Sequence, residues 1–141
     1  MKKNALALIG VLSLLLAAGS ALAQNHGRTI RADIPFKFVV NKQTLPAGQY
    51  EITRFGSLGE AVLVHNAETG DNAVSNANAA RSLNPADRTK LVFKRYGDRY
   101  FLSQVWVEGS SSGQQLPKSA HEAEVAMDFS SQPVVILASL R

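Results

Sequence analysis

Residues 90–107 consist of two segments rich in aliphatic and aromatic residues, on both sides of a Gly97-Asp98 pair, and they hold the only Trp and two of the three Tyr of the chain. A two-residue loop that begins with Gly suits a type II′ or type I′ turn, so this stretch predicts a β-hairpin against which the other strands pack. In a regular ladder Leu91 pairs with Gln104, and a shift of one residue would exchange the two faces. The inward face is then predicted to carry Leu91, Phe93, Arg95, Tyr100, Leu102 and Trp106, and the outward face Val92, Lys94, Tyr96, Arg99, Phe101, Ser103, Val105 and Val107.

Shorter strands are predicted before the hairpin. Residues 34–40 alternate cleanly, and Pro35 suggests an edge strand or a strand start. Residues 71–81 are poor in large apolar side chains and are interpreted as a weak edge strand or an ordered loop. The remaining predicted strands are 49–55 and 61–65, separated by turns at 41–43, 45–48, 56–59 and 82–87.

The segment after the hairpin adds one helix and a last strand. Residues 109–113 form a Ser/Gly linker that we expect to be mobile. Ser119 and Glu122 have the spacing of a capping box, in which each side chain satisfies a free backbone N–H, so a short helix is predicted over about 119–127. Residues 134–140 are almost wholly apolar, as in a strand buried on both faces or closing a barrel. Together these elements predict an all-β fold, a small antiparallel barrel or sandwich of six to eight strands with one short helix near the C-terminus.

The first 23 residues have the pattern of a secretory signal peptide. Two lysines at positions 2 and 3 precede an apolar stretch over residues 5–18, and Ala21-Leu22-Ala23 supplies the small residues of a cleavage site. The apolar stretch is short for a membrane-spanning helix. We therefore expect cleavage after Ala23, one domain over residues 24–141 without a stable membrane span, and a location in the periplasm or outside the cell.

Composition narrows the functional classes. Without the signal peptide the formal charge falls from +4 to +2, with 13 Lys and Arg against 11 Asp and Glu. The cations form no basic block and no nucleic-acid motif is present, so nucleic acid is not expected as a partner. The chain contains no cysteine, which excludes disulfides, thiolate metal sites and a cysteine nucleophile.

The strongest candidate for a binding site is the hairpin tip at residues 95–100, where arginines next to tyrosines could hold an anionic or sugar ligand. The alternative, which we favour, is that Arg and Tyr stack across the strands and Asp98 serves the turn. Inward aromatic residues could also line a cup for one small apolar ligand, although small barrels are usually filled by such side chains. The candidate binding residues are Arg95, Arg99, Tyr100 and Trp106.

Catalytic and metal-binding patterns are weak. Residues 109–113 match the G-x-S-x-G nucleophile pattern, but His121 then precedes Asp128, which is the reverse of the order that the pattern requires. His121 and Glu124 could share one face of the predicted helix, yet a catalytic zinc needs three protein ligands. No carboxylate pair, phosphate loop, dinucleotide fingerprint or haem motif stands out. We therefore expect no catalytic residue, no metal and no cofactor.

Three segments carry a resemblance to a known group. LPAGQYEI at residues 45–52, LVFKRYGDRYFLSQVW at 91–106 and LPKS at 116–119 are similar to small exported proteins of environmental Gram-negative bacteria that share an LPAG-x-Y turn and an RYGDRYFL hairpin. The similarity spans most of the chain after residue 23. It implies a small exported β protein, and no particular activity, ligand or site residue.

These observations favour a non-enzymatic exported protein, either a structural or interaction module of the cell envelope or a binder of a small ligand. The expected partner is a small apolar ligand or an envelope component, and a third mode is addition of a partner strand to the weak edge at residues 73–80. The alternative is a small periplasmic hydrolase. An apolar cup near Tyr100 and Trp106 would favour a binder, and converging acid–base side chains an enzyme.

Overall fold

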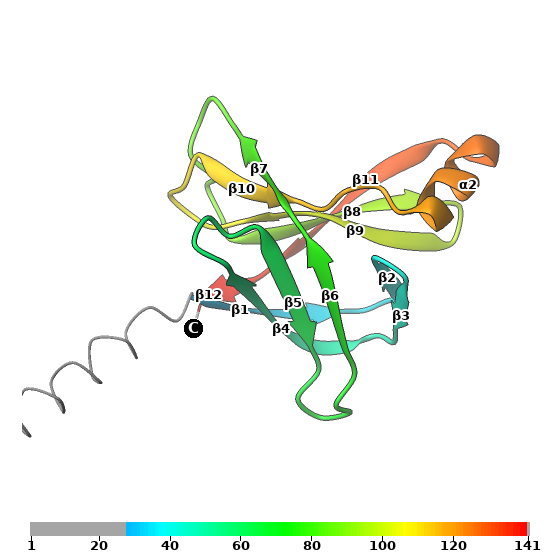
Figure 1. The fold of residues 1–141 in the computed structure, drawn as a ribbon, viewed down its shortest axis with the longest axis horizontal. Helices are drawn as coiled ribbons and strands as arrows, with labels where there is room; N and C mark the ends of the chain where they lie inside the picture. The colour runs from blue at the N-terminus through cyan, green and yellow to red at the C-terminus, as the bar shows by residue number, and fades with distance from the viewer. Residues whose placement is uncertain (1–27, 141) are drawn as a thin grey trace, which may run out of the picture.

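The computed structural model describes residues 28–140, so the predicted signal peptide lies outside the described residues. The prediction of an all-β fold with one short helix is confirmed, and the arrangement is sandwich-like and not a closed barrel (Figure 1). The elements are β1 (Thr29–Ile34), β2 (Phe38–Val40), β3 (Gln43–Leu45), β4 (Gly48–Phe55), β5 (Ala61–His65), β6 (Asn72–Asn76), β7 (Asn78–Arg81), β8 (Lys90–Tyr96), β9 (Arg99–Trp106), β10 (Ser112–Gln115), α2 (Ala120–Asp128), β11 (Ser131–Leu137) and β12 (Ser139–Leu140).

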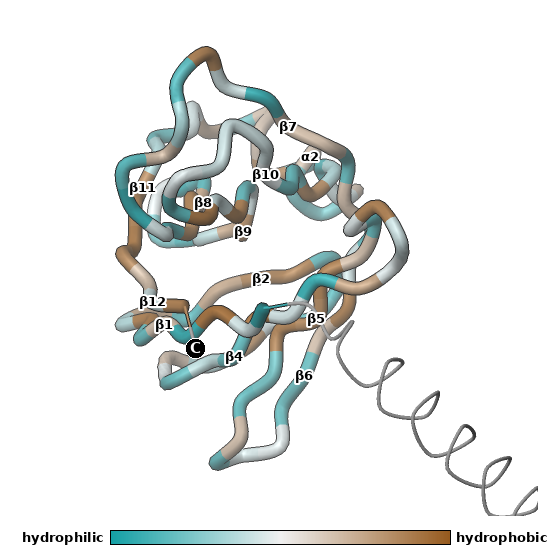
Figure 2. The backbone as a smooth tube through the Cα atoms, turned by 90° about the vertical axis from the view of Figure 1, so that its left-hand side faces the viewer, coloured by the Kyte–Doolittle hydropathy of each residue, from teal (hydrophilic) through white to brown (hydrophobic). Residues whose placement is uncertain are grey.

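Two sheets form the layers of the sandwich (Figure 2). One has the strand order β12-β1-β4-β5-β6, and the other has the order β11-β8-β9-β10-β7, with β2 paired to β9 and β3 to β2. Two segments pass from one sheet to the other, because β6 continues into β7 after Ala77 and β11 continues into β12 after Ala138. Such changes of sheet divide the chain into short strands, which is why the described residues hold twelve strands and not six to eight.

The predicted strand at residues 34–40 is instead the junction of β1 and β2. The chain leaves the strand conformation at Pro35 and re-enters it at Phe38, in the other sheet. The predicted inward alternation is right, since Ile34, Phe38 and Val40 are all buried. The junction therefore carries one continuous apolar stripe from the first sheet to the second.

Two predictions about the C-terminal half are wrong. The segment 109–113 is not wholly a linker, because β10 begins at Ser112 and pairs with both β7 and β9. The segment 134–140 is not buried on both faces, because Val135 is 50% and Leu137 58% exposed. The physical reason is that β11 is the edge strand of its sheet, with one face toward the core and the other toward solvent.

The predicted hairpin turn is present. Gly97 and Asp98 form a two-residue loop, and Tyr96 pairs with Arg99 as expected. Gly97 has a φ of +62° whereas Asp98 does not have a positive φ, which fits a type II′ turn. This turn matches the twist of the flanking strands β8 and β9.

A β-bulge in the hairpin changes the register that the sequence predicts. Along β9 the pairing with β8 passes from Leu102 directly to Gln104, so Ser103 has no partner on β8. One extra residue exchanges the two faces of the strand beyond it. Val105 therefore faces the core with no exposed surface, while Trp106, predicted to point inward, lies outside the core cluster.

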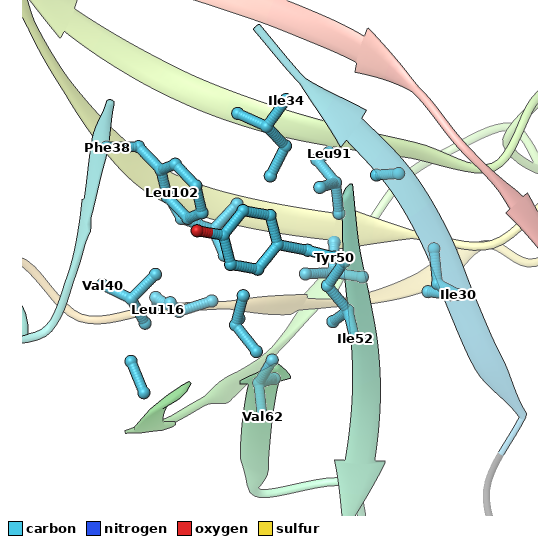
Figure 3. Packing of buried hydrophobic residues seen from close by; sticks show 14 of the residues in the cluster. Ile30, Ile34, Phe38, Val40, Tyr50, Ile52, Val62, Leu91, Leu102 and Leu116 are labelled. Carbon is cyan, nitrogen blue, oxygen red and sulfur yellow. The ribbon is translucent and has the colours of Figure 1, made fainter. Parts of the chain in front are cut away.

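The core fills the space between the sheets (Figure 3). Tyr50 lies at its centre, 1% exposed, with its ring 5.0 Å from that of Phe38 in an edge-to-face contact. Its hydroxyl donates a hydrogen bond to the carbonyl oxygen of Pro46 at 2.6 Å, so the polar end of the side chain is satisfied. Burial raises the pKa of Tyr50 above its usual value. Each large side chain buried here stabilises the fold by roughly 1.5–3 kcal/mol.

Helix α2 covers the outward face of the hairpin tip. Tyr96 and Phe101, predicted to be outward, are 3% and 2% exposed because Val125 of the helix packs on them. Ser119 caps the helix as predicted, its Oγ accepting a hydrogen bond from the backbone N–H of Glu122 at 3.2 Å. The carboxylate of Glu122 accepts a hydrogen bond from the Tyr96 hydroxyl, at 3.0 Å, where the capping box predicted a backbone N–H. This side chain therefore joins the helix to the hairpin.

Candidate functional site

The hairpin tip, β2–β3 and α2 gather at one end of the molecule (Figure 1). Residues of these elements line a cleft of about 410 Å³. This volume falls in the range of small-molecule sites. We call it the tip cleft, and its lining residues are Lys37, Phe38, Val39, Thr44, Asp98, Arg99, Tyr100 and His121.

Four separate segments position the lining of the tip cleft. The parallel pairing of Val39 with Phe101 joins β2 to β9, and this places Lys37 beside the hairpin tip. Thr44 comes from β3, which pairs with β2, and His121 comes from the first turn of α2. Because α2 is fixed to the hairpin through Tyr96, the walls of the cleft belong to elements that are held together.

The tip cleft combines an apolar floor with a cationic rim. Phe38 is 1% exposed, and the half-buried ring of Tyr100 stacks on Phe36 with a centroid distance of 3.8 Å. Lys37 and Arg99 are exposed and, within residues 28–140, neither has an ion-pair partner within 4 Å. These two side chains therefore keep their full capacity to bind an anion.

The four predicted binding residues do not meet in one place. Arg99 and Tyr100 line the tip cleft together. Arg95 does not line it, because its Nε donates a hydrogen bond to the carbonyl oxygen of Gly97 at 2.7 Å and its guanidinium lies 5.6 Å from the centroid of the Tyr100 ring. For Arg95 the interpretation as a cross-strand stacking residue is confirmed.

Trp106 lies at a different cleft, of about 320 Å³. The bulge turns its ring away from the core, and its Nε1 donates a hydrogen bond to Oε1 of Gln104 at 3.0 Å. The ring packs against Gly113 of β10, where an added Cβ would lie 2.7 Å from it. The loop that follows β7 forms the opposite wall, and the residues from it are Ser82, Asn84, Pro85, Ala86 and Asp87.

Six lining residues of the tip cleft were not predicted as binding residues, and three of them are polar residues from outside the hairpin. Lys37 and Thr44 are ordinary polar positions of short strands, and the sequence patterns pointed to His121 only as a metal ligand or as a member of a catalytic triad. Only the parallel contact between β2 and β9 brings them to the hairpin tip, and a contact between distant segments leaves no local pattern. The arginine–tyrosine composition of the tip is the one signal that pointed to this place.

Among residues 28–140 no group of three His, Asp or Glu side chains is arranged to hold a metal ion, and Glu124 and His121 form no such group. The same part of the chain contains no helix with the length and hydropathy needed to cross a bilayer.

Compared with known proteins, the chain matches no protein-family model, no curated protein and no solved structure. The geometry of the tip cleft is therefore the basis for a functional interpretation.

Proposed function

We propose that this protein is a non-enzymatic exported binding protein whose tip cleft holds a small anionic ligand with an apolar or planar body. The observation that carries the proposal is the pair of cations, Lys37 and Arg99, which have no ion-pair partners in the described part of the chain and line the same cleft as Phe38 and Tyr100. Cleft sites commonly combine an apolar lining with a few charged groups that orient the ligand.

The cationic rim makes an anion the preferred ligand. Asp98 is the one carboxylate of the lining, against the two cations Lys37 and Arg99, so the cleft has an excess of positive charge. Arg99 can hold a carboxylate through two parallel hydrogen bonds, and its planar guanidinium can also stack on an aromatic ring. An aromatic carboxylate has both features, a planar apolar ring and a terminal anion.

The location that we propose is the periplasm or the exterior. The support is the signal-peptide pattern of residues 1–23, which lies outside the described residues. The sequence resemblance to small exported bacterial proteins also supports an exported location. In this setting the ligand is a small solute or an anionic component of the envelope.

The binding proposal can be tested by isothermal titration calorimetry with benzoate as the probe. We expect benzoate to bind and its uncharged analogue benzamide to bind roughly tenfold more weakly, because it lacks the anion. Arg99→Ala and Lys37→Ala should each weaken benzoate binding by roughly three- to tenfold. Arg88→Ala removes an exposed cation that does not line the cleft, and should leave the affinity unchanged.

Two results would contradict the proposal. Equal binding of benzoate and benzamide would show that the cations do not select the ligand. Hydrolysis of 4-nitrophenyl acetate that is lost in His121→Ala would favour the hydrolase alternative, since His121 is the group in the tip cleft best suited to general-base catalysis.

A further inference from the structure

A second cleft, of about 330 Å³, lies on the face of the β7–β10–β9–β8 sheet where α2 begins. It shares no lining residue with the tip cleft. We call it the bulge cleft, and the polar side chains that line it are Asn78, Lys94, Ser103, Gln115, Lys118 and Glu122.

The carboxylate of Glu122 is incompletely paired. The residue is 6% exposed, and its Oε1 accepts the hydrogen bond from the Tyr96 hydroxyl. Its Oε2 has no hydrogen-bond donor among residues 28–140, and no cationic nitrogen of these residues lies within 4 Å of the carboxylate. Among the described residues the fully buried side-chain atom without a hydrogen-bond partner is Nε of Arg54, so Oε2 of Glu122 is not sealed from solvent. It opens at the bulge cleft and is free to accept a hydrogen bond from a ligand.

Ser103 is a second buried polar residue at the same cleft. It is 6% exposed, and its hydroxyl forms no hydrogen bond with the described part of the chain, although its backbone carbonyl accepts one from Leu116. Ser103 is also the extra residue of the β-bulge. Bulges redirect side chains and are frequent beside functional sites. A role of the Ser103 hydroxyl in ligand binding would therefore account for the β-bulge as well.

Two lysines add the opposite charge. Lys94 is half-buried in β8, and Lys118 is exposed just before α2. Neither forms an ion pair within the described residues, and in particular neither reaches Glu122. The bulge cleft therefore presents one carboxylate and two ammonium groups that do not neutralise each other by direct contact.

We propose that the bulge cleft binds a free α-amino acid. The ligand's ammonium group donates to Oε2 of Glu122 and to the Ser103 hydroxyl, and its carboxylate accepts from Lys94 and Lys118. A ligand with only one charge would leave either the buried carboxylate or the lysines unmatched. The volume of the cleft accommodates a small side chain, beside Leu116.

Calorimetry with L-alanine and two partial analogues tests this proposal. We expect L-alanine to bind, and propionate, which lacks the ammonium, and ethylamine, which lacks the carboxylate, to bind at least about tenfold more weakly. Binding of propionate as tight as that of L-alanine would overturn the proposal, because it would show an anion site only. Absence of heat with L-alanine, glycine and L-serine at millimolar concentration would overturn it as well.

Matched variants locate the site. Glu122→Gln keeps an oxygen that accepts from Tyr96 but removes the charge, and Lys118→Ala changes an exposed side chain that forms no ion pair with the described residues. Each should weaken L-alanine binding by about tenfold. Lys42→Ala removes an exposed cation elsewhere, and Arg99→Ala alters only the tip cleft. Both should leave L-alanine binding unchanged, and loss of binding in either would contradict the assignment to the bulge cleft.

Discussion

At the scale of single residues, the contact between Tyr96 and Glu122 links the fold to both clefts. The two side chains are buried, and the hydrogen bond of 3.0 Å between them joins α2 to the hairpin. Burial, followed by the hydrogen bond to Glu122 and its charge, raises the pKa of Tyr96. The sequence suggested only a capping role for Glu122, because capping is a local pattern and the contact with Tyr96 spans 26 residues.

Removal of the Tyr96 hydroxyl should destabilise the protein. Tyr96→Phe leaves Oε1 of Glu122 buried without its donor, and we expect a loss of about 1–3 kcal/mol in the free energy of unfolding, measured by urea denaturation at pH 7. Tyr100→Phe is the control, because the Tyr100 hydroxyl forms no hydrogen bond with the described residues. An equal effect of both substitutions would show that the hydroxyl of Tyr96 is not the cause.

The same tyrosine predicts a dependence of stability on pH. A tyrosine pKa that is raised in the folded state means that the folded protein holds the proton more tightly, so the stability from this group is complete below pH 10 and is lost as the pH rises through the folded pKa. Tyr50 acts with the same sign. We expect stability to fall above about pH 10, and to fall less steeply in Tyr96→Phe. Stability that rises above pH 10 would contradict this assignment.

Gly113 shows how closely the sheet packs around Trp106. A Cβ at this position would lie 2.7 Å from the indole ring and 2.7 Å from the carbonyl oxygen of Val105. We expect Gly113→Ala to lower the melting temperature, with a cost of roughly 1–3 kcal/mol, because the backbone or the ring must move. Ser112→Ala, at the exposed neighbouring position, should have little effect. An unchanged melting temperature for Gly113→Ala would mean that the indole is not held against β10.

At the scale of elements, periodicity predicted where the strands lie better than which way their side chains point. The turn at Gly97-Asp98 and the helix near residue 120 follow from local chemistry, and both were predictable. The bulge at Ser103 was not predictable, because β9 carries apolar residues on both faces and its sequence does not show where the register shifts. The faces of Val105 and Trp106 were therefore assigned incorrectly.

The turn itself is open to a direct test. Gly97 has a φ of +62°, which a β-branched residue adopts only with strain, although a Cβ there would meet nothing nearer than the Phe129 ring at 3.7 Å. Gly97→Val should therefore destabilise the hairpin by more than about 1 kcal/mol through backbone strain alone. Asp98→Ala, next to it with ordinary φ, should cost less. Thermal unfolding of Gly97→Val that matches the unchanged protein would exclude the proposed turn.

At the scale of the whole molecule, the two sheets are joined where β6 passes into β7 and β11 into β12. All-β architecture followed from the many short alternating segments, but these crossings did not, since they depend on how the two layers are oriented. The residues of the tip cleft were likewise predictable from the sequence only in part. Arg99 and Tyr100 were found from composition, whereas Lys37 and His121 reach the tip cleft only through the tertiary fold.

The proposed export can be tested separately, with the chain that includes residues 1–23. Expressed with residues 1–23 in a Gram-negative host, the protein should be recovered from the periplasm or medium with Gln24 as its first residue, as shown by intact mass and N-terminal sequencing. A variant without residues 2–23 should stay in the cytoplasm. Recovery of the uncleaved chain from the cytoplasm would contradict the proposed location.

The central claim is that the tip cleft recognises a small anion. The most direct measurement is a map of backbone amide shifts in ¹⁵N-labelled protein titrated with benzoate. We predict saturable shifts that are largest for the amides of Val39, Thr44, Tyr100 and His121, with little change around Trp106. Shifts that are largest around Trp106, or the absence of saturable shifts at millimolar benzoate, would contradict it.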